Sequence, residues 1–401
     1  MRKQTAYRAL AAAVVSAALT ATTLTATASA APAGPHDATQ AAMDAQVRAG
    51  VPGVLGGARD GRDVWHGSSG VADLTTHRPR LAHDRFRIGS ISKAFTSTVL
   101  LQLESEGRIG LDDTVEHWLP GVVHGNGHDG SRITVRQVLN HTSGIYNYTE
   151  DPAMLARLST DFLRHRYDTT TPRQLVDIAM THAPYAPPGE TWHYSNTNYI
   201  LAGMIVEKVT GRSYADEIRE RIIGPLHLNA TTLPGTSPRM PGPHGRAYSK
   251  LEDTKPDAKI YDVTELNPSW GGAAGEIIST TDDLNRFYHA LFGGRLLPEQ
   301  QQKELMTTVP TDEKNTGHYG LGVASVTLPC GKDLWFHDGG IHGSLSVAAS
   351  TADGRHTAAF NFNDDWTGDS TGMVLAEYCG TAKPADGGAA RSALTRLAAL
   401  R

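Results

Sequence analysis

The sequence predicts an α/β fold in which an antiparallel sheet, flanked by helices, carries an inserted and mainly helical domain. Alternating apolar residues occur near both ends of the chain, whereas helical periodicity fills the region between them. Strands that lie so far apart in the sequence most simply share one sheet, with the middle of the chain inserted between them. No internal repeat of about 20 to 50 residues is visible, which disfavours solenoids and propellers.

The composition is that of an ordinary globular protein. The 401 residues are 39% apolar and 20% charged, which excludes collagen, coiled coils and disordered chains. There are 37 basic and 42 acidic residues, the net charge is −5, and no basic run stands out. We therefore expect no nucleic-acid partner.

Residues 1–30 predict a secretory signal peptide. Three basic residues precede a stretch of mostly Ala, Val, Leu and Thr, which ends on the small residues Ala-Ser-Ala at positions 28–30. A membrane anchor is the alternative, and the short, Thr-rich stretch disfavours it. We therefore expect a secreted, extracellular protein whose mature form has no membrane span.

The elements follow in order along the rest of the chain. Residues 51–58 and 64–71 alternate around Asp60-Gly61, which predicts a hairpin. Helical patterns predict helices at residues 90–106, 135–139, 197–210, 281–291 and 370–377. Further alternation predicts strands at residues 320–328, 333–337, 344–350 and 356–363. The predicted domain spans residues 31–380, with a helical lobe at roughly 110–265, and residues 381–401 are a linker and tail.

Cys330 and Cys379 are the two cysteines of the chain. In an oxidising compartment an even pair is more economically interpreted as one disulfide than as a metal or redox site. Common metal and phosphate motifs are absent from the sequence, so we expect no metal and no cofactor. Residues 125–130 match the dinucleotide pattern Gly-x-Gly-x-x-Gly but follow no predicted strand, which favours a surface loop.

The strongest candidate for chemistry lies at the start of a predicted helix, where Lys93 follows Ser90 by three residues. This spacing places both side chains on one helical face, where a neutral amine can accept the hydroxyl proton. The helix start also directs free backbone N–H groups toward the serine. Taken alone, the same pattern also describes an N-cap serine beside a surface lysine.

Two further motifs contain residue types that suit acyl transfer. In residues 194–196, Tyr-Ser-Asn, a phenol can relay a proton beside an ammonium, and an amide can bind a substrate carbonyl or N–H. In residues 337–340, His-Asp-Gly-Gly, at the end of a predicted strand, the glycines allow close backbone approach to a ligand and an N–H for an oxyanion hole. Each motif alone also describes an ordinary polar or Gly-rich turn.

In this order, the three motifs resemble the active-site motifs of the penicillin-recognising serine hydrolases. The similarity covers roughly residues 51–379 and is strongest to secreted bacterial D-alanyl-D-alanine carboxypeptidases and their class C β-lactamase relatives. Residues 139–144, Leu-Asn-His-Thr-Ser-Gly, and residues 319–322, Tyr-Gly-Leu-Gly, also contribute to it. The resemblance implies a β-lactamase-like fold.

The resemblance also implies roles for the site residues. Ser90 would be the acylated nucleophile, Lys93 or Tyr194 its base, and Tyr194 the proton donor to the leaving group. His337 would order this proton network, and Asn196 would hold the amide of the acyl side chain.

The oxyanion would be bound by the backbone N–H groups of Ser90 and Gly340, next to Gly339, and Trp270 would form an apolar wall. Asp338 and Gly340 stand where the carboxypeptidases have hydroxyl side chains that bind the terminal carboxylate of the substrate. An ionised Asp beside that carboxylate would be repulsive by about 1 to 4 kcal/mol. The sequence therefore disagrees with carboxylate recognition at this one position.

We predict a secreted serine hydrolase for D-configured peptides, with a D-alanyl-D-alanine carboxypeptidase as the leading interpretation. A D-aminopeptidase, a D-amino-acid amidohydrolase, an esterase or a class C-like β-lactamase on the same fold is the alternative. A binding protein without turnover is the third interpretation, which the complete set of motifs disfavours. The expected partner is a D-configured or cell-wall peptide, and a β-lactam could form a covalent adduct.

Overall fold

The computed structural model describes residues 34–255, 257–312 and 317–381, and the described residues from Pro35 onward form one compact unit. The predicted signal peptide and residues 382–401 of the predicted tail lie outside the described residues. In the described part of the chain, no helix is both long enough and apolar enough to cross a membrane.

An eight-stranded antiparallel sheet takes strands from both ends of the chain, in the order β2-β1-β14-β13-β12-β11-β10-β9. The strands are β1 (Gly53–Asp60), β2 (Asp63–Gly70), β9 (Val309–Pro310), β10 (His318–Tyr319), β11 (Ala324–Thr327), β12 (Asp333–Ile341), β13 (Ser344–Thr351) and β14 (His356–Phe362). Because the N-terminal hairpin pairs with β14, the predicted sharing of one sheet by both chain ends is confirmed.

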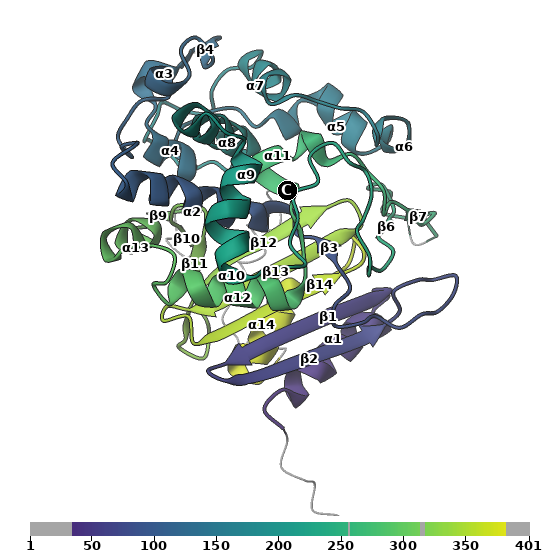
Figure 1. The fold of residues 1–401 in the computed structure, drawn as a ribbon. Coiled ribbons are helices and arrows are strands. Elements are labelled where there is room, and N and C mark those ends of the chain that lie inside the picture. Colours follow the sequence, from purple (N-terminus) through teal and green to yellow (C-terminus); the bar gives the residue numbers. More distant parts are fainter. Residues whose placement is uncertain (1–33, 256, 313–316, 382–401) are drawn as a thin grey trace, which may run out of the picture. The chain divides into compact units, whose positions relative to one another are not determined.

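Helices flank the sheet and fill the middle of the chain (Figure 1). They are α1 (Asp37–Arg48), α2 (Ser92–Ser105), α3 (Val115–Trp118), α4 (Val135–Leu139), α5 (Pro152–Leu158), α6 (Phe162–His165), α7 (Pro172–Met180), α8 (Asn196–Thr210), α9 (Tyr214–Ile218), α10 (Gly224–Leu226), α11 (Gly272–Gly275), α12 (Thr281–Phe292), α13 (Glu299–Met306) and α14 (Ser370–Cys379). The predicted fold class is therefore confirmed.

The sheet is buried on both faces, because successive residues of its central strands belong to two different hydrophobic clusters. Trp335 packs in the cluster that contains α2 and α12, whereas its neighbour Phe336 packs in the cluster that contains α1 and α14. Such alternation is what a strand with two covered faces requires. We call the α12 side the inner face and the α14 side the outer face.

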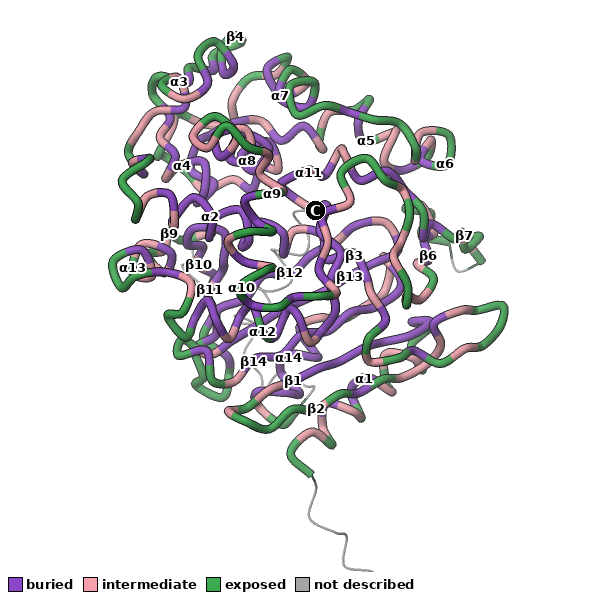
Figure 2. The backbone as a smooth tube through the Cα atoms, viewed as in Figure 1, coloured by how far each residue is buried: buried purple, intermediate pink, exposed green. Residues whose placement is uncertain are grey.

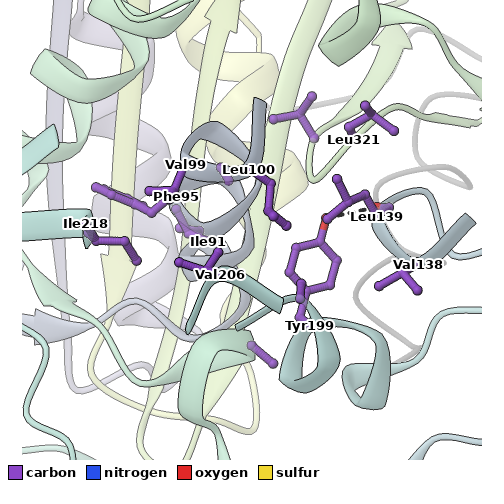
Figure 3. Close-up of a cluster of buried hydrophobic side chains, with 14 of the residues drawn as sticks. Ile91, Phe95, Val99, Leu100, Val138, Leu139, Tyr199, Val206, Ile218 and Leu321 are labelled. Atoms are coloured by element: carbon purple, nitrogen blue, oxygen red, sulfur yellow. Dashed lines mark hydrogen bonds between the residues drawn. The ribbon is translucent and has the colours of Figure 1, made fainter. Parts of the chain in front are cut away.

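Helix α2 is the centre of the inner cluster. Most of its residues are buried, including polar ones, and it packs against α8, α9, α11 and α13 (Figure 2). Phe95 stacks on Phe287 of α12 with ring centroids 3.7 Å apart, and Val99 and Leu100 belong to the same hydrophobic cluster as Tyr199 and Val206 of α8 (Figure 3). A helix enclosed in this way holds its N-terminus in a fixed place.

Two predicted strands differ from the structure, and one helix of the structure was not predicted. The strand predicted at residues 320–328 is interrupted, because Gly322, with φ +84°, makes a turn between β10 and β11. The strand predicted at residues 333–337 continues to Ile341, so the glycines at 339 and 340 lie inside β12 and not in a turn after it. Helix α1 was not predicted.

Two smaller predictions are settled by the structure. Cys330 and Cys379 form a disulfide with a Cα–Cα distance of 5.8 Å, as predicted. Residues 124–129 form a two-residue antiparallel ladder, β4 (His124–Gly125) with β5 (His128–Asp129), and not the strand-to-helix turn that binds a dinucleotide.

Candidate active site

Ser90 lies in a short 3-10 turn, Gly89–Ile91, that leads into α2. Gly89 has φ +52°, and a Cβ atom there would lie 2.8 Å from the backbone nitrogen of Gly340. A Cβ atom at Gly339 would lie 1.9 Å from the carbonyl oxygen of Ile88. Both positions therefore require glycine, because β12 runs directly against the turn that carries the serine.

Lys93 is the most completely buried charged group of the site, with 0% exposure. Its Nζ lies 2.8 Å from Ser90 Oγ, 2.8 Å from Asn196 Oδ1 and 2.9 Å from the carbonyl oxygen of Ala274 in α11. The Asn196 and Ala274 oxygens can only accept hydrogen bonds. Two of the lysine hydrogens are therefore committed, and the contact with Ser90 depends on the protonation of the amine.

In the ammonium form, Lys93 donates its third hydrogen to Ser90 Oγ, whereas the neutral amine accepts the serine hydroxyl proton. Burial lowers the pKa of Lys93 well below its usual range, and the charge of Asp338 partly opposes this shift. The neutral form is thus accessible at a pH where an exposed lysine would be fully charged. The contact between Lys93 and Ser90 can then serve for proton transfer.

The second motif begins α8, with Asn196 as the first residue of the helix instead of a loop residue. The backbone N–H of Ser195 donates to Nδ1 of buried His141 at 3.2 Å, and the backbone N–H of Asn196 donates to Asn147 Oδ1 at 3.0 Å. Lys93 Nζ lies 4.8 Å from the ring centroid of Tyr194. An ammonium over the face of a phenol ring is attracted by the electron density of the ring.

The third motif lies in β12, beside the second one. His337 is 3% exposed, and its ring centroid lies 6.5 Å from that of Tyr194. Asp338 is 6% exposed and places Oδ1 at 3.9 Å from His337 Nδ1. Its carboxylate is the negative charge that acts on Lys93.

A cavity of about 560 Å³ opens above Ser90. Five predicted site residues line it: Ser90, Tyr194, Asn196, Trp270 and Gly340. In the part of the chain that the structure describes, Asp338 and Gly339 are not among the lining residues. The structure therefore does not place these two residues, for which the sequence predicted substrate binding, on the cavity wall.

Sequence reasoning missed much of the cavity wall. Residues 249–254 and Asp365-Trp366 line the cavity, as do Tyr148, Thr149 and His342, although none of them belongs to a recognised motif. The carbonyl of Ala274, which accepts a hydrogen bond from Lys93, has no signal in the sequence, because any residue type offers a carbonyl. His141 and Tyr319 belonged to the resemblance, but no role was assigned to them.

Comparisons with known proteins agree with this geometry. The profile of the family described as Beta-lactamase matches residues 36–386. Penicillin-binding protein 4* of Bacillus subtilis is 28% identical over 340 residues, which cover 82% of this chain and 72% of that protein.

Two solved structures of hydrolases are similar along nearly their whole length. A D-stereospecific amidohydrolase from a Streptomyces species is 56% identical, with a TM-score of 0.82, over 86% of this chain and 99% of that one. The D-amino acid amidase from Ochrobactrum anthropi SV3, complexed with D-phenylalanine, is 28% identical, with a TM-score of 0.71, over 82% of this chain and 92% of that one.

Proposed function

Because the chain belongs to the Beta-lactamase family and is a serine hydrolase, we propose that it is a D-stereospecific amidohydrolase that cleaves amides of D-amino acids. The observation that carries the proposal is the 56% identity to a D-stereospecific amidohydrolase across 99% of that chain. The contact of 2.8 Å between Ser90 Oγ and Lys93 Nζ supplies the chemistry that this activity requires.

The proposed reaction begins with acylation of Ser90. Its Oγ attacks the amide carbon while its proton passes to the neutral amine of Lys93, which lies in hydrogen-bonding contact. The N–H groups of Ser90 and Gly340 stabilise the negative oxygen that develops. Tyr194 donates a proton to the departing nitrogen, the carbon–nitrogen bond breaks, and ammonia leaves the acyl-enzyme.

Deacylation repeats the same steps with water as the nucleophile. Tyr194 lines the cavity with its ring beside Lys93, and the phenolate left after it protonates the departing nitrogen can take the proton of the attacking water. When the ester bond breaks, the ammonium of Lys93 returns its proton to Ser90 Oγ, and the D-amino acid is released. His337 orders this network without contacting the substrate.

The cavity wall favours a large apolar acyl side chain. Trp270, Leu158 and Ile341 line it, and the rings of Trp270 and His342 are nearly perpendicular, with centroids 5.7 Å apart. Apolar surfaces of this kind gain free energy by removing an aromatic ring from water. D-phenylalanine, which occupies the related amidase structure, is therefore the natural first substrate to test as its amide.

The charge of Asp338 supports an uncharged substrate terminus. This buried carboxylate lies in β12, two residues before Gly340, whose backbone borders the cavity. A substrate carboxylate at this edge would be repelled, whereas a carboxamide would not. Asp338 therefore favours an amidohydrolase over a carboxypeptidase.

The carboxypeptidase that the sequence predicted is kept as the second candidate, because of the similarity to the Bacillus penicillin-binding protein. The same Ser90 acylation would serve it, and a β-lactam would form its adduct on Ser90 in either case. The two candidates differ in whether the substrate ends in a carboxylate or a carboxamide.

The test compares matched substrates on residues 31–401 at one pH. We expect D-phenylalanine amide to be cleaved and L-phenylalanine amide to be cleaved at least about a hundredfold more slowly. For an N-acyl-D-Ala-D-Ala peptide, we expect the C-terminal amide to exceed the free acid in kcat/KM. Faster cleavage of the free acid would establish the carboxypeptidase instead.

Asp338→Asn is the matched variant for this comparison, because it removes the charge and keeps the shape. We expect it to lower the ratio of amide to acid cleavage by up to about tenfold, since it removes the repulsion from the acid alone. An unchanged ratio would show that Asp338 does not set this preference.

We also propose that the protein is exported. The disulfide between Cys330 and Cys379 supports this, because such bonds persist in oxidising compartments. Expression of the full chain in a secreting bacterium should place the enzyme in the medium with a new N-terminus near residue 31. Retention of Met1 on a cell-bound protein would contradict export by signal cleavage.

A further inference from the structure

Tyr319 is buried with 0% exposure, and its hydroxyl oxygen lies 3.0 Å from His337 Nε2. The contact is built by strand register, because Tyr319 pairs with Ala324, which in turn pairs with Phe336, the residue before His337. The two rings meet edge to face at 84°, with centroids 5.8 Å apart. The first residue of the Tyr-Gly-Leu-Gly motif therefore contacts the imidazole of His337.

The other ring nitrogen of His337 identifies its tautomer. Nδ1 lies 2.5 Å from the carbonyl oxygen of Asp338, which can only accept a hydrogen bond. Nδ1 therefore carries a hydrogen, and in the neutral imidazole Nε2 carries the lone pair. A lone pair at Nε2 needs a donor, which the Tyr319 hydroxyl supplies.

The chemistry of Tyr319 fits a permanent donor. Burial raises the pKa of Tyr319 well above its usual range, so its hydroxyl keeps its proton at neutral pH. If His337 were doubly protonated, the direction of this hydrogen bond would reverse, and Nε2 would donate to the phenol oxygen of Tyr319. The imidazolium would also add a second buried positive charge to a site that already holds Lys93.

The titratable groups around His337 come from several elements. They are Tyr319 of β10, Asp338 of β12, Tyr194 before α8, Tyr288 of α12 and His141 after α4. Asp338 is the one acidic side chain of this set and it also acts on Lys93, so its single negative charge is shared. When His337 is neutral, the positive charge of the Lys93 ammonium is balanced by the negative charge of the Asp338 carboxylate.

We propose that Tyr319 is a positioning residue that holds His337 as the neutral Nδ1–H tautomer, so that proton transfer at Ser90 is left to Lys93 and Tyr194. A lysine at position 337 would add a positive charge there. His337, which Tyr319 holds in its neutral form, adds no charge. The inference concerns the acyl-transfer machinery and is independent of the substrate proposed above.

The direct test is the tautomer itself, measured by NMR on protein labelled with [15N]histidine. The signal of His337 is identified by its loss in His337→Asn. We expect the wild type to show the neutral Nδ1–H form from about pH 6 to about pH 8, and Tyr319→Phe to show a mixture of forms that changes with pH. The same Nδ1–H form in Tyr319→Phe, or an imidazolium in the wild type, would overturn the proposal.

Kinetics distinguish positioning from simple destabilisation. We expect Tyr319→Phe to lower kcat by about tenfold to a hundredfold with little change in KM and with an added ionisation in the pH profile. The control is Tyr378→Phe, which removes another buried hydroxyl, one that donates to the carbonyl oxygen of Ala349 on the outer face. It should lose comparable thermal stability and keep the wild-type pH profile. Equal kinetic effects of the two variants would contradict a positioning role.

Because the NMR readout needs no substrate, it can fail or succeed separately from the proposed function. Loss of the tautomer effect with intact cleavage of D-phenylalanine amide would overturn only the role of Tyr319. The reverse result would overturn only the substrate assignment.

Discussion

The two faces of the sheet each hold a buried ionisable side chain, Lys93 on the inner face and Glu377 on the outer face. Glu377 accepts hydrogen bonds from His36 Nδ1 at 3.0 Å, Thr39 Oγ1 at 2.8 Å and His356 Nε2 at 2.8 Å. Lys93 also makes three contacts, but the one with the Ser90 hydroxyl can reverse its direction. One network is fixed, and the other has a movable proton.

The pKa shifts follow this difference. Burial opposes the charge of both groups, but the His and Thr hydrogen bonds outweigh it at Glu377 and lower the pKa of that carboxyl. At Lys93 burial outweighs the field of Asp338, and the pKa falls well below its usual range. The outer group therefore stabilises the fold as an ion, whereas the inner group is disposed to lose its charge and react.

The largest effect is expected from Ser90→Ala, which leaves Lys93 without its reversible partner. Hydrolysis of D-phenylalanine amide should fall by about 10⁴-fold or more, because the variant lacks the hydroxyl that is held in contact with Lys93 Nζ. Steady-state kinetics on the folded variant measure this loss. Residual activity within about tenfold of the wild type would remove Ser90 from the mechanism.

Lys93→Met tests whether the buried amine serves reaction and not stability. The rate should fall by about a thousandfold, because no base remains beside Ser90. Thermal stability should stay equal or rise, since a buried ammonium is replaced by an apolar chain of similar length. A large loss of thermal stability would make Lys93 a structural ion like Glu377.

Removing the disulfide tests the outer face, where Cys379 ends α14. Replacing both Cys330 and Cys379 by serine should lower the free energy of unfolding by up to about 4 kcal/mol, because the open chain gains conformational freedom. Urea unfolding measures the loss, and kcat/KM should stay at the wild-type value at a temperature where both proteins are folded. A parallel loss of kcat/KM would show that the two faces are coupled.

Glu377→Gln should cost about 2 kcal/mol at neutral pH, because hydrogen bonds to a charged acceptor are lost. The folded pKa lies below the usual 4.5, so the stability of the ion is fully present above pH 4.5 and is lost as the pH falls through the folded pKa. The difference between wild type and variant should therefore be constant above this pH and shrink below it. A difference that grows on acidification would contradict the lowered pKa.

The smallest effect concerns the pH dependence of acylation. The rate needs neutral Lys93, so kcat/KM should rise with pH through the lowered pKa of Lys93. Asp338→Asn removes the charge that raises this pKa, and the rising limb should move to lower pH. Movement to higher pH would show that Asp338 does not stabilise the ammonium of Lys93.

The sequence was sufficient for those parts of the site that depend on local spacing. Ser90 lies in the 3-10 turn that leads directly into α2 and Lys93 lies in the first turn of α2, so their contact follows from the three-residue spacing and is visible in the pattern. The continuation of β12 to Ile341 was missed because paired glycines usually indicate a turn, whereas here they admit the close approach of the Ser90 turn. Local patterns do not show which backbone a glycine faces.

Contacts set by strand register could not be predicted. Tyr319 reaches His337 only because two successive strand pairings bring them together, and neither pairing has a local signal. The part of the cavity wall that contains Lys250 and Trp366 comes from loops that carry no motif. Predicting these residues requires the tertiary structure, whereas the nucleophile Ser90 could be predicted from its local spacing to Lys93.

The central claim is that Ser90 becomes acylated by D-amino acid substrates. Rapid acid quenching of the enzyme with D-phenylalanine methyl ester, followed by mass spectrometry of its peptides, tests this claim most directly. The account predicts a phenylalanyl group on the peptide that contains Ser90, absent in Ser90→Ala and far weaker with the L-ester. An adduct on another residue, or equal labelling by both enantiomers, would contradict it.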